Sequence, residues 1–285
     1  MQTKIKRKNI WDLMFVAPAC VLFFVFIILP FLQGIPYSFR DWDGFSPQIN
    51  WVNFKNYINI FKDRMIYSSS WHTLQFTFVE VVFSNVFGLL FALGVKRKSK
   101  TNNILRTLLF MPFVISMVLA SFIWSYVYSD VIAPIFNTRS ILGNTTWVMT
   151  GLGFISVWRD AGYCMVIYIA ALNAIPSSFY EAASIEGATR RRQFKSITIP
   201  MIVPAITANV SLLLSWGLKV FDYPFSITGG GPGTASTTIN LYIYNNIFGF
   251  YHAGYGQALA IIFTIVIFLI TTVVAKTLRS KETEL

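Results

Sequence analysis

Long apolar runs, separated by short polar segments, dominate the pattern of the chain. A helix needs about 20 mostly apolar residues to cross the hydrocarbon core of a bilayer. We therefore expect an all-α integral membrane protein with about six transmembrane helices. The predicted spans are Leu13–Ile35, Thr73–Val95, Thr107–Tyr128, Trp147–Leu172, Met201–Tyr223 and Gln257–Ala275. The first run is too long for the apolar core of a signal peptide, and no small-residue cleavage site follows it, so we expect a retained helix.

These spans predict three regions. Residues 1–72 would hold an N-terminal tail, the first span and an outer loop. Residues 73–279 would hold the other spans and a long polar connection at 174–200, and residues 280–285 would form a tail. We expect both termini and the 174–200 connection on the cytoplasmic side.

Polar connections contain their own local signals. The outer loop from Pro36 to His72 predicts a turn at Asp41–Gly44 and a short helix at Asn56–Phe61. The later loop from Pro224 to Gly256 contains Thr228–Gly233, a cluster of four glycines and a proline that cannot continue a helix.

Composition and charge support a membrane protein. Hydrophobic residues make up 55% of the chain and charged residues only 12%, with a mean hydropathy of +0.57. The formal charge of +11 does not indicate nucleic-acid binding, because the basic residues are clustered in alternate connections. Sixteen lie on one predicted side and five on the other, so the positive-inside rule makes the richer side cytoplasmic. The sixteen are Lys4, Lys6, Arg7, Lys8, Lys96, Arg97, Lys98, Lys100, Arg106, Arg190, Arg191, Arg192, Lys195, Lys276, Arg279 and Lys281.

Candidate chemistry is sparse. Cys20 and Cys164 lie within apolar runs, and the two histidines, His72 and His252, are isolated, so we expect neither a disulfide framework nor a metal site. Charged residues inside the predicted spans are more informative, because intramembrane charge is costly and usually faces protein or a water-filled path. These residues are Glu80, Arg159, Asp160, Lys219 and Asp222.

The connection at 174–200 predicts a short surface helix. Pro176 ends the preceding span, and Ser178 with Glu181 has the spacing of a capping box. Small residues follow, and Arg190–Arg192 would lie near the C-terminal end of the helix, where cations favour the helix dipole. This pattern fits an ordinary amphipathic connector or a surface that another protein approaches closely.

The same connection resembles a known signature. Glu181-Ala182-Ala183, Gly187 and the run Ile197-Thr198-Ile199-Pro200 match the EAA loop of bacterial ATP-binding-cassette (ABC) importer permeases, with Ile199 in place of the usual leucine. Further segments are similar to the carbohydrate-uptake branch, which includes the maltose and multiple-sugar permeases, so the resemblance covers most of the chain. These segments are Phe39–Trp42, Val52–Tyr57, Lys219–Asp222 and Thr228–Pro232.

The resemblance implies a type I ABC importer permease, multi-pass in the bacterial cytoplasmic membrane. Such a permease would form half of a pore with a second homologous permease subunit. Its partners would be two copies of a cytoplasmic ATPase and an extracytoplasmic sugar-binding protein. By the same resemblance, Glu181, Ala182, Ala183 and Gly187 would dock on the ATPase, and Ile197 and Pro200 would also belong to the ATPase-coupling residues.

The chain has no Gly-Lys dipeptide and therefore no Walker A loop. We accordingly expect a non-catalytic subunit with no cofactor of its own. ATP and Mg would bind to the partner ATPase.

Helical spacing predicts a substrate path between two spans. Ser156, Arg159, Asp160 and Tyr163 share one face of the fourth span. Trp216 and Lys219 share a face of the fifth span, with Gly217 beside them. Aromatic rings that stack on sugar rings, together with polar groups that bind hydroxyls, would suit a carbohydrate.

Other interpretations remain open at this stage. The same residues would also suit helix packing with an internal Arg159–Asp160 or Lys219–Asp222 pair, and Glu80 is a candidate partner for Lys219. A secondary transporter would show inverted repeats, and a membrane enzyme would need a catalytic constellation; neither is visible. A permease for another solute, such as glycerol phosphate or amino acids, shares the EAA loop, and the Thr228–Pro232 element favours carbohydrate.

Overall fold

The computed structural model describes residues 14–280. Leu13, at the start of the first predicted span, lies outside the described residues, as do Lys4, Lys6, Arg7, Lys8 and Lys281 of the charge count. Within the described part, five helices are long and apolar enough to cross a membrane, and the number is six if a bent pair of helices forms one span. The five are Met14–Ser38, Arg64–Val95, Met117–Ile135, Val148–Ala174 and Ala253–Arg279. The prediction of about six spans is confirmed.

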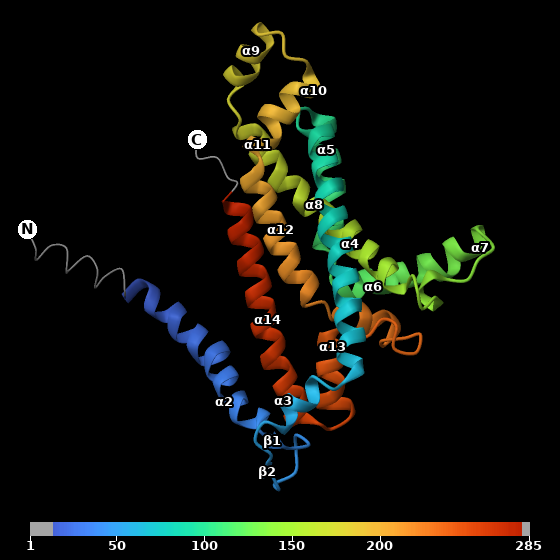
Figure 1. The fold of residues 1–285 in the computed structure, drawn as a ribbon. Coiled ribbons are helices and arrows are strands. Elements are labelled where there is room, and N and C mark those ends of the chain that lie inside the picture. The colour runs from blue at the N-terminus through green and yellow to red at the C-terminus, as the bar shows by residue number, and fades with distance from the viewer. Residues whose placement is uncertain (1–13, 281–285) are drawn as a thin grey trace, which may run out of the picture. The chain divides into compact units, whose positions relative to one another are not determined.

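The described residues fold as two compact units, the first made of residues up to Asp63 and of Ile243–Ile262. It begins with the first span, whose last part consists of η1 (Phe24–Ile28) and α2 (Leu29–Ser38), and α3 (Lys55–Ile60) confirms the predicted short helix (Figure 1). A two-stranded antiparallel sheet of β1 (Arg40–Asp41) and β2 (Asn50–Trp51) lies between these helices and was not predicted.

Side-chain hydrogen bonds hold the outer part of this unit together. The Asn56 amide donates to the carbonyls of Ser38 and Arg40, each at 2.9 Å, and so satisfies backbone groups at the end of α2. The Asp43 carboxylate accepts hydrogen bonds from Ser46 and from the Phe45 amide. The Ser46 hydroxyl is the main reason that the pKa of Asp43 lies below its ordinary value. The predicted turn at Asp41–Gly44 is thus built on an ionised aspartate.

The second unit consists of Arg64–Tyr242 and of the described residues from Phe263 onward. In this unit α4 (Arg64–Val95) packs against α8 (Val148–Ala174). Helix α5 (Lys100–Val114) lies along α8, and α12 (Val203–Leu218) lies along α4. The other elements of this unit are α6 (Met117–Tyr126), η2 (Val127–Ile132), α7 (Ala133–Ile135), η3 (Ile141–Gly143), α9 (Ser177–Ile185), α10 (Arg190–Gln193), η4 (Phe194–Thr198), α11 (Ile199–Met201) and η5 (Pro224–Thr228).

Three elements near the C-terminus complete the described chain. Helix α13 (Ile239–Tyr244) and the final helix α14 (Ala253–Arg279) each contain residues of both units, whereas η6 (Asn245–Gly249) belongs to the first. Helix α13 and η6 occupy part of the predicted loop from Pro224 to Gly256. The predicted helix stop at Thr228–Gly233 is confirmed, because η5 ends at Thr228 and Gly229 adopts a left-handed conformation with φ of 57°.

Small residues allow the helices of the second unit to approach closely. A Cβ atom added at Gly162 of α8 would overlap the carbonyl of Leu109 in α5, and one added at Gly88 of α4 would meet Cys164 of α8. Large apolar side chains fill the remaining space, with Met165 and Tyr168 among the most deeply buried. Close backbone approach between membrane helices is normally achieved in this way.

The third predicted span, Thr107–Tyr128, is not one helix. Helix α5 ends at Val114, Ile115 is extended with ψ of 136°, and α6 begins after Ser116. The Ser116 hydroxyl accepts a hydrogen bond from the amide of Leu119 and caps the new helix. The break does not lower the average hydropathy of the segment, so the sequence predicts one continuous span across it.

The fifth predicted span, Met201–Tyr223, is also wrong in its bounds. Residues Arg190–Met201 and α12 meet at an angle of 59°, and α12 stops at Leu218. Proline at the start of α12 explains the bend, because its ring cannot continue the preceding helix. Lys219 and Asp222, which we expected inside a helix, therefore lie in the segment that follows it. The outer loop is shorter than predicted as well, since α4 already begins at Arg64.

Candidate functional site

A cavity of about 250 Å³ lies inside the second unit. It is bordered by α4, α5, α6, α8, the end of α12 and the segment after α12. One part of its wall is apolar and aromatic, and consists of Phe76, Phe113, Met117, Trp216, Val220 and Tyr223. The other part is polar and consists of Glu80, Ser156, Arg159, Asp160, Lys219 and Asp222. A cavity with one aromatic wall and a few converging polar groups is the usual form of a small-molecule site.

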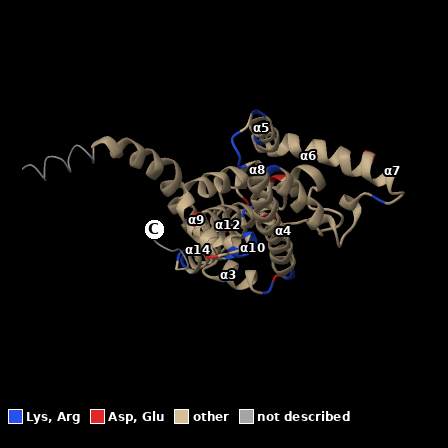
Figure 2. Ribbon diagram, turned by 90° about the horizontal axis from the view of Figure 1, so that it is seen from above, with Lys and Arg blue, Asp and Glu red and all other residues tan. Residues whose placement is uncertain are grey.

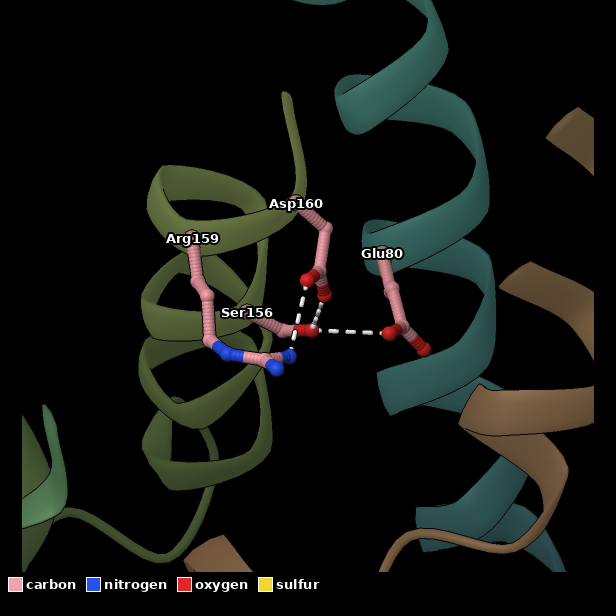
Figure 3. A network of polar contacts seen from close by, with 4 residues as sticks. All are labelled: Glu80, Ser156, Arg159 and Asp160. Atoms are coloured by element: carbon pink, nitrogen blue, oxygen red, sulfur yellow. Dashed lines mark hydrogen bonds and ion pairs between the residues drawn. The ribbon is translucent and has the colours of Figure 1, made fainter. Parts of the chain in front are cut away.

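The polar wall is built around Ser156 on α8 (Figure 3). Its hydroxyl lies 2.8 Å from Oε1 of Glu80 on α4 and 2.8 Å from Oδ2 of Asp160, one turn further along α8. The other carboxylate oxygen of Asp160 accepts a hydrogen bond from the Arg159 guanidinium at 2.9 Å. Glu80 and Asp160 are almost fully buried, with 3% and 1% of their surface exposed.

Arginine links the polar wall to the aromatic wall. The Arg159 guanidinium lies 4.9 Å from the centre of the Phe113 ring, which is the geometry of a cation–π contact. Phe113 stacks on Tyr163 at 4.8 Å and on Trp216 at 6.2 Å, and Tyr163 and Trp216 lie 5.5 Å apart. Three rings from α5, α8 and α12 thus form one aromatic cluster beside the cavity.

Most of the predicted path residues converge on this cavity. Ser156, Arg159, Asp160, Trp216 and Lys219 line it. Tyr163 lies behind the wall, where it supports Phe113 and Trp216. Gly217 also lies behind the wall, and a Cβ atom at this position would meet the Glu80 carboxylate and Thr77. Gly217 therefore allows α12 to approach α4 closely.

Two sequence expectations about the charged groups have different outcomes. Within the described residues the Arg159–Asp160 pair is formed. The expected Glu80–Lys219 pair is not, because Ser156 is the side chain that lies at hydrogen-bond distance from Glu80. Phe113 and Met117 line the cavity without having been predicted. They lie on either side of the helix break at 115–116, which the apolar pattern of the segment did not predict.

The 174–200 connection contains two helices rather than one. Helix α9 ends at Ile185, and Gly187 follows with φ of 75°, a conformation that favours glycine. The three arginines then occupy the first turn of α10, where Thr189 accepts a hydrogen bond from the amide of Arg192. They do not lie at the C-terminal end of α9, so the expected dipole interaction is wrong.

The predicted capping box of α9 is also absent. The helix begins at Ser177, one residue earlier than expected, and Pro176 is the residue before it, with no side-chain cap. Because Pro176 already holds the extended conformation that precedes a helix, no capping hydroxyl is needed to turn the chain. Ser178 and Glu181 are consequently exposed residues of the helix itself.

The residues that we expected to couple to the ATPase differ in their exposure. Glu181, Ala182 and Gly187 are exposed, whereas Ala183, Ile197 and Pro200 are half-buried. Ile185 at the end of α9 is 89% exposed, which sequence reasoning did not single out. A hollow of about 320 Å³ lies beside α9 and is lined by Ala183, Glu186, Ala188, Arg192, Gln193, Ser196 and Ile197. The end of α9 thus presents one exposed apolar side chain, next in sequence to Glu186, which lines this hollow.

Hydrogen bonds brace this surface from within. The Gln193 amide donates to the Ser184 hydroxyl at 2.9 Å and to the Ala188 carbonyl at 3.3 Å, across the turn between α9 and α10. In the neighbouring connection, the Arg106 guanidinium donates to the carbonyls of Val95 and Lys96 and closes the end of α4. Figures 1 and 2 place the arginines of α10 and the basic residues before α5 at the same end of the second unit. This arrangement agrees with their assignment to one side of the membrane.

Comparison with known proteins identifies the family. The model of the binding-protein-dependent transport system inner membrane component matches residues 84–282. A probable starch degradation products transport system permease protein of Thermoanaerobacterium thermosulfurigenes is 32% identical over 290 residues, which cover 100% of this chain and 99% of the relative. The multiple sugar-binding transport system permease protein of Streptococcus mutans is 29% identical over 279 residues, which cover 95% of this chain and 96% of the relative.

A solved structure shows the same fold. A chain of a bacterial ABC transporter involved in the import of the acidic polysaccharide alginate superposes with a TM-score of 0.80 and 23% identity, over 98% of both chains. The helices, the cavity between them and the sequence matches lead to one conclusion: the chain belongs to the family of binding-protein-dependent transport system inner membrane components.

Proposed function

We propose that this chain is the permease subunit of an ATP-driven importer for oligosaccharides, in which it forms half of the translocation pore. It is a non-catalytic, multi-pass protein of the inner membrane. The observation that supports a sugar best is the cavity, which sets Trp216 and Phe113 against Ser156 and Asp160. The relatives named above are a starch degradation products permease and a multiple sugar permease, which favours the same class of solute.

Each wall of the cavity has a part in this proposal. The indole of Trp216 stacks on the apolar face of a sugar ring, while carboxylate oxygens of the polar wall accept hydrogen bonds from sugar hydroxyls. Arg159 is held by Asp160 and by the Phe113 ring, so its remaining N–H groups stay oriented toward the cavity. A sugar would therefore meet groups that are already positioned, which reduces the entropy cost of binding.

Coupling to ATP hydrolysis is assigned to the 174–200 connection. We infer that Glu181, Ala182, Ala183 and Gly187 dock on a cytoplasmic ATPase, and that Ile197 and Pro200 carry the movement into α12. Ile185 belongs to the same docking surface because it is apolar and 89% exposed. The hollow beside α9 would receive an apolar or small polar side chain of that partner.

The remaining partners complete the transporter. They are a second permease of the same family, two copies of the ATPase with bound ATP and Mg, and an extracytoplasmic binding protein that delivers the sugar. This arrangement places both termini of the chain in the cytoplasm.

The proposal is tested by uptake into vesicles. The chain is reconstituted with the second permease, the ATPase and the binding protein, and ATP-dependent uptake of a labelled malto-oligosaccharide is measured. Saturable uptake that needs both ATP and the binding protein is expected. A complex that imports glycerol phosphate or an amino acid, and none of a panel of oligosaccharides, would contradict it.

A further inference from the structure

The polar wall contains two carboxyl groups that share one hydroxyl. Ser156 Oγ lies 2.8 Å from an oxygen of Glu80 and 2.8 Å from an oxygen of Asp160 (Figure 3). Both distances are those of a good hydrogen bond between oxygen atoms. All three side chains are buried, with at most 3% of their surface exposed.

The protons available to these contacts can be counted. If both carboxyl groups are ionised, the Ser156 hydroxyl supplies the only proton for two contacts. A serine hydroxyl has a single proton to donate, and an ionised carboxylate can only accept. Ser156 can therefore satisfy one of the two contacts as a donor. With both carboxyl groups ionised, the two contacts must share this one proton, whereas a proton on one carboxyl group lets both become full hydrogen bonds.

The surroundings decide which carboxyl group this is. Asp160 accepts a hydrogen bond from Arg159 at 2.9 Å, which stabilises its ionised form. Glu80 has no ion pair within the described part of the chain, and its second oxygen, Oε2, is buried without a hydrogen-bond partner. That oxygen lies against the backbone of α12 at Gly217, where a Cβ atom would overlap it.

The other polar and charged groups of the cavity do not change this assignment. Lys219, Asp222 and Tyr223 face the cavity from the segment after α12, and none forms a hydrogen bond with Glu80 in the described structure. Cys164 on α8 is buried in the neighbouring core. A buried carboxylate with one unpartnered oxygen and no ion pair of its own is unfavourable, whereas the neutral acid leaves only a carbonyl-like oxygen without a partner.

We propose that Glu80 is held as a neutral carboxylic acid that donates its proton to Ser156, and that Ser156 in turn donates to Asp160. Glu80 is then a positioning residue. It orients the Ser156 hydroxyl and the Asp160 carboxylate, and through Asp160 it fixes the guanidinium of Arg159 on the cavity wall. The hydrogen bonds therefore run from Glu80 on α4 through Ser156 to Asp160 on α8, and Asp160 is paired with Arg159.

Infrared spectroscopy of the reconstituted importer complex tests this assignment. A protonated carboxyl group has a carbonyl stretch that an ionised carboxylate lacks. The difference spectrum between the wild-type complex and a Glu80→Gln complex is expected to contain one such band. Because the amide of glutamine keeps one donor and one acceptor, this variant preserves the pattern of hydrogen bonds. Asp130→Asn, which changes an exposed carboxylate outside the cavity and the proposed docking surface, is the control and should leave the band in place.

Isotope labelling locates the proton. Carbon-13 in glutamate side chains should shift the band, and carbon-13 in aspartate side chains should leave it unchanged. The absence of an acid band, or a band that shifts only with labelled aspartate, would overturn the proposal.

A second variant tests the donor chain without altering Glu80. Ser156→Ala removes the acceptor of the Glu80 proton, and the band should move to the higher wavenumber of a free acid. A band that stays at its wild-type position would show that Ser156 is not the acceptor. These spectra do not depend on transport, so they are independent of whether the solute proposed above is correct.

Discussion

The Tyr180 hydroxyl lies 2.9 Å from Oγ1 of Thr198 and so joins α9 to η4, the segment that leads through α11 into α12. Thr198 is buried, and the bond spans the proposed ATPase-coupling connection from one end to the other. A force applied to α9 can therefore reach α12 without passing through the turn at Gly187.

Removing this bond should loosen coupling. Tyr180→Phe keeps the ring and deletes a hydrogen bond whose net worth is about 1 kcal/mol. We expect fewer sugar molecules imported per ATP hydrolysed, with the complex still assembled. The ratio of uptake to phosphate release in vesicles measures this effect. Tyr126→Phe, at a tyrosine of α6 that is 63% exposed, serves as the control. An unchanged ratio in Tyr180→Phe would show that the bond only stabilises the loop.

Charge at Gly187 should prevent docking of the ATPase. Gly187→Asp adds a carboxylate to the proposed contact surface, and we expect loss of uptake and weaker co-purification of the ATPase. Gly187 has φ of 75°, so any side chain at this position also introduces backbone strain. Gly187→Asn has nearly the same shape and strain without the charge, and should retain more of both properties. Equal losses in the two variants would assign the effect to the backbone.

The ring of Trp216 should contribute to sugar binding. Truncation in Trp216→Ala removes the stacking surface, and an aromatic contact of about 1 kcal/mol beyond area burial corresponds to about a five-fold rise in the half-saturating concentration. Stimulation of ATPase activity by sugar-loaded binding protein reports this value. Trp71→Ala, at a tryptophan of α4 that is 61% exposed, is the control. If Trp216 serves only for packing, its loss should lower thermal stability and leave transport per assembled complex unchanged.

The contact between α5 and α8 at Gly162 should leave no room for a methyl group. A Cβ atom at this position would overlap the backbone of Leu109 and Phe110, so α5 and α8 would have to separate. We expect Gly162→Ala to destabilise the protein by about 1–3 kcal/mol, seen as a lower midpoint of thermal unfolding in detergent. Gly94→Ala in α4 has open space around its Cβ position and should be neutral or slightly stabilising. Similar midpoints for the two variants would contradict the packing described for α5 and α8.

Thiol labelling of intact cells tests the orientation. Cysteines placed at Lys100 and Arg192 should resist a membrane-impermeant reagent, and those placed at Asn53 and Thr234 should react. The basic connections before α5 and in α10 lie at one end of the second unit, so positions 100 and 192 should behave alike. Labelling at position 100 but not at 234 would reverse the proposed topology.

The hydropathy pattern correctly predicted those helices that are long enough to cross the membrane without a break. It placed α8 to within two residues at either end and gave the last residue of α4, because long apolar runs bounded by polar segments follow directly from the thickness of the bilayer. It did not reveal the break at Ile115–Ser116 or the bend before α12. The break is accompanied by one serine cap and the bend by one proline, and single residues do not alter the average hydropathy of a window.

The candidate site was predictable only in part, for a related reason. Helical spacing brought Ser156, Arg159 and Asp160 to one face, and this is a local property of α8. The sequence contains no signal for which residue of another helix lies opposite. Phe113 stacks on Tyr163 because a glycine at position 162 lets α5 approach α8, and Glu80 meets Ser156 because α4 packs along α8. Such contacts depend on the register of one helix against the next.

The glycine contacts have a mechanical consequence. Helices α4, α5 and α8 approach so closely at Gly88 and Gly162 that neither position has room for a side chain. They form a stiff body, and motions that reshape the cavity must occur at the joints beside it. Two joints are at hand: the extended residue Ile115 between α5 and α6, and the 59° elbow that precedes α12. A change of angle at the elbow would shift α12 along α4, and the close contact of Gly217 with Glu80 and Thr77 limits that shift at the cavity.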